Sequence, residues 1–222
     1  MNGWRAIGMA GLVLTAAAPV AAQFTPGDVF YGGSAGEIHN ITGGGDFALV
    51  TPFADTGQYS ASQFVWSLDL ETMYVGHVQV GTVSAIDSSG TVTTFAEGID
   101  GPTGLVMTRD GRLLVAAFNQ GEIYDITAGG TLPPEQPPLV TGLNGPRSMV
   151  ELADGRILVA DQFANAVYDI GYPDGGAVGA PFADGHDSPR ALAVAPDGTI
   201  YVNSDASGGS VYDITTGGAP AV

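Results

Sequence analysis

The chain has 222 residues, with 34 Gly, 14 Pro and no Cys, and a formal net charge of −17. This length allows one large domain or two small ones, and a chain without cysteine must rely on its core rather than on disulfides. The surplus of acidic residues excludes nucleic acid and anionic membrane surfaces as partners, because both require a basic surface. Calcium and a cationic partner stay compatible with this charge, although a solvated acidic surface explains it without either.

Residues 1–22 have the features of a secretory signal peptide. Arg5 provides a positively charged start, residues 7–18 form a short apolar core, and residues 20–22 are the small residues of a cleavage site. The apolar run is too short to span a bilayer. We therefore expect an exported protein, secreted or periplasmic, that is cleaved near the Ala22–Gln23 bond and is not inserted in a membrane. An unstructured apolar N-terminus is the alternative.

The remainder, residues 23–222, repeats one unit. Residues 145–170 read GPRSMVELADGRILVADQFANAVYDI, and similar units occupy residues 101–126 and 188–214. An isoleucine near the end of each unit recurs at spacings of 45, 40, 44 and 44 residues: Ile41, Ile86, Ile126, Ile170 and Ile214. Each period of about 43 residues holds four short β-type runs and no amphipathic helix. This pattern predicts an all-β fold, a β-propeller with four-stranded antiparallel blades.

The four strands of a blade are named a to d from the channel outward. We expect strand a at residues 63–70, 104–108, 148–152 and 191–195, and strand b at residues 28–32, 73–77, 113–118, 157–161 and 199–203. We expect strand c at residues 37–41, 82–87, 122–127, 166–170 and 210–215, and strand d at residues 47–52, 91–96, 138–141 and 180–183. An Asp-Gly pair between strands a and b predicts a hairpin in which both turn residues have a positive φ.

The two ends of the chain do not complete the expected ring. The first blade has no strand a before Asp28, and Val222 falls inside an expected strand d, which leaves about 4.5 blades. Since an open ring would expose unpaired strand edges, we expect a C-terminally truncated six-bladed propeller that lacks roughly 60 residues. A five-bladed ring that lacks two strands is the alternative.

A binding site is expected on one face of the propeller. The a-to-b turns and c-to-d links are short, whereas the d-to-a and b-to-c loops on the opposite face are longer and more variable. There, the position after the loop proline begins the innermost strand, and it holds Thr103, Arg147 and Arg190 in successive blades. Two arginines facing a narrow channel would bind a carboxylate or phosphate. Alternatively, they pair with acidic residues such as Asp100, Asp161 or Asp187 and only fill the channel.

Four further polar residues of this face are candidates for ligand binding. Asp161 and Asn203 are expected to hydrogen-bond the loop backbone, with calcium binding as the alternative. His186 and Asp187 lie in a d-to-a loop. The histidines of the chain have no metal-ligand spacing, so we predict neither a metal site nor another cofactor. The sequence also contains no Gly-x-x-x-x-Gly-Lys motif.

The repeat pattern PxGLxxxxDGxLLVAxxxxGxIYDI resembles NHL repeats and the related six-bladed propellers of the SMP-30/gluconolactonase/streptogramin-lyase group. In the lactonases of that group, the resemblance implies a channel metal held by a Glu of the first inner strand and by an Asn and an Asp of later ones. Arg147 and Arg190 stand at inner-strand positions where such ligands would be, and a guanidinium cannot bind a metal. The streptogramin lyases require a catalytic His and a metal-binding Glu in the channel, and His186 alone does not meet that requirement.

These observations predict a monomeric exported β-propeller that acts as a recognition module. Its partner would be a small anionic molecule or a protein, bound at the loop face around Arg147 and Arg190. The competing hypothesis is a hydrolase or lyase of the lactonase type, with a divalent metal and with part of its catalytic groups in a missing C-terminal segment.

Overall fold

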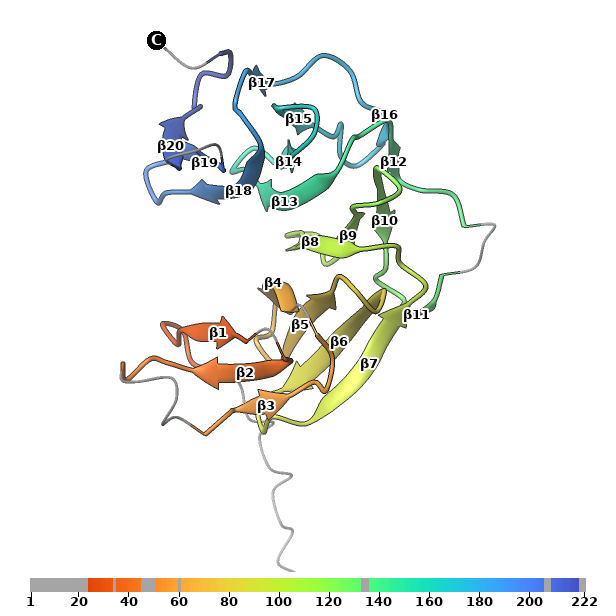
Figure 1. The fold of residues 1–222 in the computed structure, drawn as a ribbon, viewed down its shortest axis with the longest axis vertical. Helices are drawn as coiled ribbons and strands as arrows, with labels where there is room; N and C mark the ends of the chain where they lie inside the picture. The colour runs from red at the N-terminus through yellow and green to blue at the C-terminus, as the bar shows by residue number, and fades with distance from the viewer. Residues whose placement is uncertain are drawn as a thin grey trace, which may run out of the picture.

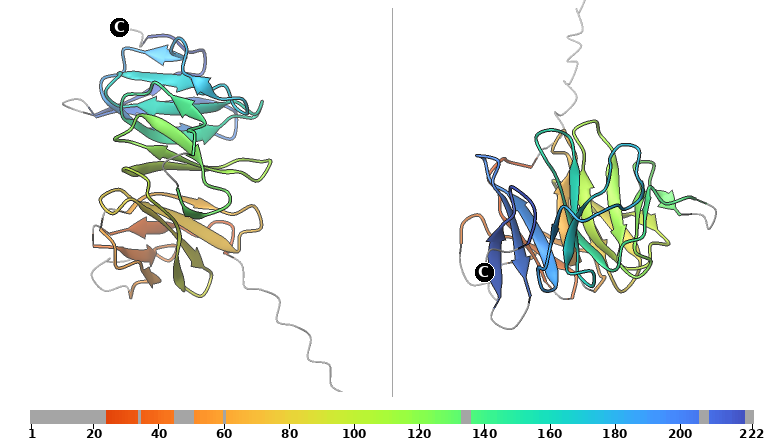
Figure 2. Two further views of the ribbon diagram at one scale, coloured as in Figure 1. Left: turned by 90° about the vertical axis from the view of Figure 1, so that its right-hand side faces the viewer. Right: turned by 90° about the horizontal axis from the view of Figure 1, so that it is seen from above.

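The computed structural model describes residues 24–33, 35–44, 51–59, 61–132, 136–205 and 209–219. The strands of these residues form five sheets that follow one another along an arc, in chain order (Figure 1). Two further views show the sheets stacked side by side like the blades of a propeller (Figure 2). The fold is therefore an all-β propeller, as predicted. The described part of the chain contains no helix able to cross a membrane, and the expected signal peptide lies outside it.

The blades are numbered in chain order. Blade 1 has the order β1-β2-β3, with strands Phe30–Gly32, Glu37–Asn40 and Ala54–Asp55. Blade 2 has β4 to β7, with strands Ala61–Trp66, Thr72–His77, Thr82–Asp87 and Val92–Glu97. Blade 3 has β8, β9, β10 and β12, with strands Pro102–Met107, Leu113–Ala117, Glu122–Asp125 and Val140–Thr141. Blade 4 has β13, β14, β15 and β17, with strands Pro146–Glu151, Ile157–Asp161, Ala166–Asp169 and Ala183–Asp184. Blade 5 has β18 to β20, with strands Pro189–Val194, Ile200–Ser204 and Ser210–Asp213.

The described residues form five blades rather than six, and the blades have three to five strands rather than four throughout. Two short strands that the sequence did not predict add to the outer edges of blades 2 and 3: β11 (Gly130–Thr131) and β16 (Gly176–Ala177). Each belongs to the c-to-d link of the following blade and pairs in parallel with strand d of the blade before it. The Gly-Gly links therefore connect neighbouring blades as well as neighbouring strands.

Some strand limits differ from the prediction, most clearly in blade 1. Its outer strand was expected at residues 47–52, but residues 51–52 are not in a strand and residues 45–50 lie outside the described residues. The outer strand is Ala54–Asp55, whose register with β2 pairs Asp55 with Glu37. The inner strand of blade 2 ends at Trp66, before the predicted residue 70, because the backbone turns at Leu70, which has a φ of 59°.

The Asp-Gly hairpins occur where predicted, but their turn type is different. Only the glycine has a positive φ, and its value is 89° in each of Gly111, Gly155 and Gly198. In blade 4, Leu152 N donates to Arg156 O and Gly155 N donates to Leu152 O. This is the three-residue hairpin, a turn followed by a left-handed glycine in a bulge, and it leaves the aspartate in an ordinary conformation.

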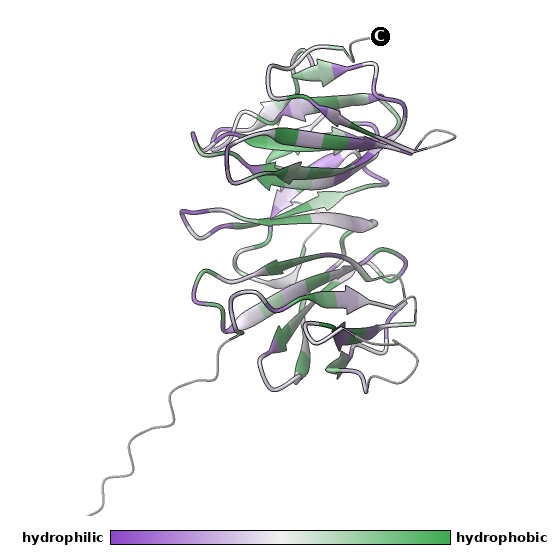
Figure 3. Ribbon diagram, turned by 90° about the vertical axis from the view of Figure 1, so that its left-hand side faces the viewer, coloured by the Kyte–Doolittle hydropathy of each residue, from purple (hydrophilic) through white to green (hydrophobic). Residues whose placement is uncertain are grey.

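The hydrophobic core lies between the blades. Four clusters of buried side chains each join one blade to the next. One position of the second strand is fully buried in each of blades 2 to 5 and is always valine: Val75, Val115, Val159 and Val202. Coloured by hydropathy, the strands carry most of the hydrophobic residues (Figure 3). The repeated valine therefore marks an interblade contact, and its recurrence in the sequence reflects packing.

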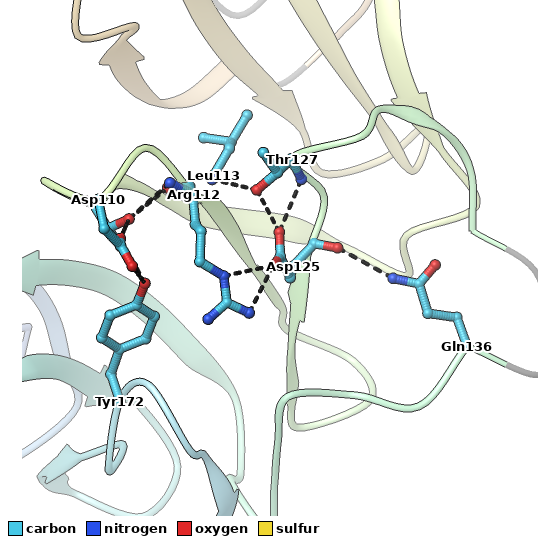
Figure 4. Close-up of polar contacts among 8 residues, drawn as sticks. Asp110, Arg112, Leu113, Asp125, Thr127, Gln136 and Tyr172 are labelled. Carbon is cyan, nitrogen blue, oxygen red and sulfur yellow. Dashed lines mark hydrogen bonds and ion pairs between the residues drawn. The ribbon is translucent and has the colours of Figure 1, made fainter.

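Polar contacts also join the blades on the face of the a-to-b turns. Tyr172, in the c-to-d link of blade 4, donates its hydroxyl to the carboxylate of Asp110 in the turn of blade 3, with both oxygens at 2.7 Å (Figure 4). Arg112 lies 5.3 Å from the centre of the Tyr172 ring and forms an ion pair of 2.7 Å with Asp125. Asp110 and Asp125 of this face thus stabilise turns and, in the case of Asp110, a contact between blades.

Candidate functional site

Each inner strand contains an irregularity at the same point, directly after its first residue. The register shifts between Ala61 and Phe64 in blade 2, and at the equivalent place in the other complete inner strands: Pro102/Leu105, Pro146/Met149 and Pro189/Leu192. A β-bulge inserts an extra residue and redirects the side chains next to it. The two residues of each shift therefore occupy matching positions around the channel.

These bulge residues line a pocket at the channel mouth of about 390 Å³. It is lined by Ser62, Gln63, Thr103, Arg147, Ser148, Arg190, Ala191 and Leu192. The structure thus brings together Thr103, Arg147 and Arg190, three of the candidates selected from the sequence, and adds residues of blade 2.

Arg147 is held in place by two neighbours. Its Nε donates to Oε1 of Gln162 over 2.7 Å, and its guanidinium lies 4.2 Å from the centre of the Phe118 ring. Gln162 is 7% exposed and donates through Nε2 to the hydroxyl of Ser188 over 3.1 Å. No ion pair joins Arg147 to a carboxylate among the described residues. The guanidinium therefore has a fixed plane and keeps its outer nitrogens for a ligand.

The electrostatic surroundings of Arg147 favour an added negative charge. Partial burial lowers the pKa of the Arg147 guanidinium, the positive charge of Arg190 lowers it further, and the nearby carboxylate of Asp205 opposes these effects in part. The net lowering means that the charged form of Arg147 is less well stabilised than in water. A carboxylate or phosphate placed between the two arginines would offset the repulsion that Arg190 exerts on the charged form of Arg147.

Arg190, in contrast, already has a partner. Its Nη2 lies 2.8 Å from Oδ2 of Asp205, and both side chains are about half exposed. The pairing with a loop acid that the sequence suggested therefore occurs for Arg190, although with Asp205 and not with Asp100, Asp161 or Asp187. An exposed ion pair of this kind contributes little stability, about 0 to 1 kcal/mol, so a ligand can compete with it.

Thr103 serves the contact between blades. It is 6% exposed, and its hydroxyl donates to the carbonyl oxygen of Pro146 in the next inner strand over 2.7 Å. Ser62 makes the equivalent bond, of 3.1 Å, to the carbonyl oxygen of Pro102. These hydroxyls fix the spacing of the inner strands and so the distance between the bulges.

Asp161 and Asn203 stabilise the backbone around the pocket. Asp161 is fully buried and accepts hydrogen bonds from the backbone N–H of Asn144, at 2.6 Å, and of Ala164, at 3.3 Å, while burial raises its pKa. Asn203 accepts the backbone N–H groups of Arg190 and Ala191 at 3.1 and 2.6 Å. The second contact orients the bulge that carries Arg190.

His186 and Asp187 lie away from the pocket lining. His186 is 1% exposed, its ring centre is 5.3 Å from that of Tyr212, and burial lowers its pKa. It occupies the repeat position of Ile99 and Leu143, two buried residues between the blades. Asp187 contributes its backbone carbonyl, which accepts the hydroxyl of Ser204. His186 therefore replaces an apolar side chain in the contact of blades 4 and 5.

A second cavity, of about 480 Å³, adjoins the pocket. Arg147 lines both cavities. The other lining residues come from blades 1 and 2: Tyr31, Gly32, Gly33, Ala61, Ser62, Val78 and Gln79.

Sequence reasoning missed the residues that position the arginines. Phe118, Gln162 and Asp205 follow strand b at one equivalent position of the repeat, and each lies against an arginine of the channel mouth. Their shared repeat position is the signal that the sequence offers, and it does not show which arginine each of them contacts. The contact of each residue with an arginine depends on the β-bulge of the inner strand, and no turn residue in the sequence predicts that bulge.

The pocket does not fit the divalent metal that the resemblance implies for lactonases. Its lining side chains are hydroxyls, an amide, aliphatic groups and two guanidiniums, and a guanidinium cannot serve as a metal ligand. In the part of the chain that the structure describes, no three His, Cys, Asp or Glu side chains gather into a metal site.

Comparisons with known proteins identify the fold. No family model matches the chain, and no curated protein matches its sequence. Among solved structures, a luciferin-regenerating enzyme is 15% identical with a TM-score of 0.66, over 85% of this chain and 74% of that one. A putative gluconolactonase is 14% identical with a TM-score of 0.60, over 71% of this chain and 60% of that one, so the chain spans less than two thirds of its length. A streptogramin B lyase is 14% identical with a TM-score of 0.52, over 86% and 71% of the two chains. The chain therefore has the β-propeller fold of gluconolactonase-like and streptogramin-lyase proteins, which confirms the resemblance at the level of the fold.

Proposed function

We propose that this protein is an exported recognition module that binds a small anionic ligand, or an acidic group of a protein, at the channel mouth. One observation supports the proposal above others. Arg147 is oriented by Gln162 and Phe118 and lines two cavities, and it has no ion pair with a described carboxylate. A cation fixed in this way, with Arg190 in the same pocket, suits the fork-like binding of a carboxylate or phosphate.

Calorimetry with succinate, gluconate and inorganic phosphate, in the presence of a chelator, tests this proposal. We expect at least one of these anions to bind, and Arg147→Ala to weaken that binding at least tenfold, because a bidentate charged contact is lost. Binding should also weaken as ionic strength rises.

Arg156→Ala is the matched control. It removes the same charge from the opposite face, where Arg156 contacts Asp154 at 2.8 Å. Binding that is equally weak in both variants, or a change in melting temperature alone for Arg147→Ala, would contradict a site at the channel mouth.

We also propose that the five described blades are part of a six-bladed ring. Support comes from blade 5, where Val211 is 68% exposed and Tyr201 is 39% exposed, although the equivalent residues of blade 4, Val167 and Leu158, are fully buried. The coding sequence after Val222 tests this proposal. Further codons for strand d and a sixth blade would support it, and a stop codon at that point would contradict it.

The competing function is a hydrolase or lyase of the lactonase type, which the structural likeness to a putative gluconolactonase and a streptogramin B lyase favours. The metal content of the protein and its turnover of sugar lactones separate the two functions. Lactone turnover that a chelator abolishes would favour the enzyme, and anion binding that the chelator leaves unchanged would favour the recognition module.

A further inference from the structure

One aromatic side chain on the face of the channel mouth lies largely in water. Phe163, in the b-to-c loop of blade 4, is 59% exposed. It stands four residues after the buried valine of strand b, and the residues at the same place in blades 2 and 3 are polar, Gln79 and Asn119. The repeat therefore does not require an aromatic side chain at this position.

The conformation of the loop does not require the phenyl ring of Phe163 either. Phe163 N donates to Asn144 O over 3.0 Å, and in blade 3 Asn119 N donates to Asp100 O over 3.2 Å. The same backbone hydrogen bond thus forms with a phenyl ring and with a polar side chain. Since an exposed phenyl ring gains free energy when a second apolar group covers it, Phe163 is available to a ligand.

The ring of Phe163 continues an aromatic surface that ends at Arg147. Its centre lies 5.4 Å from that of the Phe118 ring, at an angle of 56° between the two planes. The Phe118 ring centre in turn lies 4.2 Å from the guanidinium of Arg147. A fixed cation and an exposed aromatic ring are therefore connected through one further aromatic ring.

Gly145 lets the two rings approach the backbone of the d-to-a loop. A Cβ added to Gly145 would lie 2.8 Å from Cδ2 of Phe163 and 3.0 Å from Cε2 of Phe118, too close for either ring to keep its place. All these residues belong to blades 3 and 4, which lie between other described blades. The aromatic surface is therefore complete in the structure.

We propose that the ligand of the channel mouth is a small aromatic carboxylic acid, whose carboxylate binds Arg147 and whose ring stacks against Phe163. The proposal rests on the proposed function, because it uses Arg147 in the same way, and it specifies the chemical class of the anion. Binding sites for small molecules typically combine aromatic side chains with a few well-placed polar groups. Here Phe163 provides the aromatic contact, and Arg147 provides the charged one.

Calorimetry with two monocarboxylates tests the aromatic contact. The compounds 3-phenylpropanoate and 3-cyclohexylpropanoate carry the same charge on the same flexible linker, and the cyclohexyl ring is the more hydrophobic of the two rings. Burial of apolar surface alone would favour the cyclohexyl compound, whereas stacking on Phe163 favours the phenyl compound. We expect 3-phenylpropanoate to bind at least threefold more tightly.

Three variants of the protein complete the test. Phe163→Leu keeps an apolar side chain beside Gly145 but removes the aromatic ring, so the preference for the phenyl compound should disappear. Arg147→Ala should weaken the binding of both compounds at least tenfold, because both carboxylates use the guanidinium. Leu68→Ala is the control: Leu68 is 60% exposed and lies in the a-to-b turn of blade 2, on the opposite face, so this variant should change either affinity less than twofold.

Equal affinity for the two compounds, tighter binding of the cyclohexyl compound, or a preference for the phenyl compound that persists in Phe163→Leu would overturn the contact with Phe163. A protein that binds succinate or phosphate through Arg147, but does not prefer the phenyl compound, retains the proposed function and loses this inference. A protein that binds none of these anions loses both.

Discussion

At the scale of a single residue, His77 links burial to pH. The side chain is fully buried, its Nε2 lies 2.9 Å from the hydroxyl of Ser84, and burial lowers its pKa to about 4. The unfolded chain binds a proton at this residue near pH 6.5, whereas the folded protein binds it only near pH 4. The contribution of His77 is therefore fully present above pH 6.5 and is lost as the pH falls toward 4.

We expect His77→Ala to reduce the loss of stability on acidification. Alanine is the residue at the equivalent position of blade 3, Ala117. Between pH 7 and pH 5, the free energy of unfolding should fall by about 2 kcal/mol less in the variant than in the natural protein. Urea unfolding at the two pH values measures this difference. Ser84→Ala, which keeps the imidazole, should keep the full fall, and a full fall in His77→Ala would contradict the assignment.

At the scale of an element, the Asp-Gly hairpin depends on the conformation of its glycine. Gly155 has a φ of 89°, and a Cβ added there would meet no atom within 4 Å. Gly155→Ala should therefore lower the free energy of unfolding through backbone strain alone, by roughly 1 to 2 kcal/mol. Chemical denaturation measures the change.

Gly179→Ala is the control for this hairpin. A Cβ would again meet nothing within 4 Å, but Gly179 does not have a positive φ. Alanine should leave the stability unchanged or raise it by roughly 0.4 to 1 kcal/mol, because it reduces the freedom of the unfolded chain. If both substitutions have the same effect, the strain at Gly155 is not what makes glycine necessary.

The sequence predicted these elements well where a repeated residue has one physical role. The valines of the second strand and the glycines of the turns recur because each blade buries or bends the chain at the same place. The outer strands were predicted less well, since their position depends on the link that passes the neighbouring blade. Strands β11 and β16 form because they pair with strands of the preceding blade. The residue pattern of a single repeat gives no information about pairing between blades.

The candidate site was predictable only in part, because the sequence gives the position of a residue in the repeat but not the direction of its side chain. The position after the loop proline identified Thr103, Arg147 and Arg190, and the bulges bring all three to one pocket. Two other contacts were not predictable: the ion pair of Arg190 with Asp205 and the hydrogen bond of Arg147 to Gln162. Both depend on how far each β-bulge turns the arginine side chain. His186, another candidate, occupies a repeat position that is buried between blades, and it is not among the residues that line the pocket.

At the scale of the whole molecule, the exposed face of blade 5 offers a direct test of the open ring. Val211 and Val167 are equivalent residues of β20 and β15, and they are 68% and 0% exposed. In the 222-residue chain, Val211→Lys should change the free energy of unfolding by less than about 0.5 kcal/mol, because its charge stays in water. Val167→Lys should lower it by more than about 3 kcal/mol, because it places an unpaired charge in the contact of blades 4 and 5. Denaturation of both variants measures the difference. A large loss of stability in Val211→Lys would mean that this face is covered, by a further blade or by another chain.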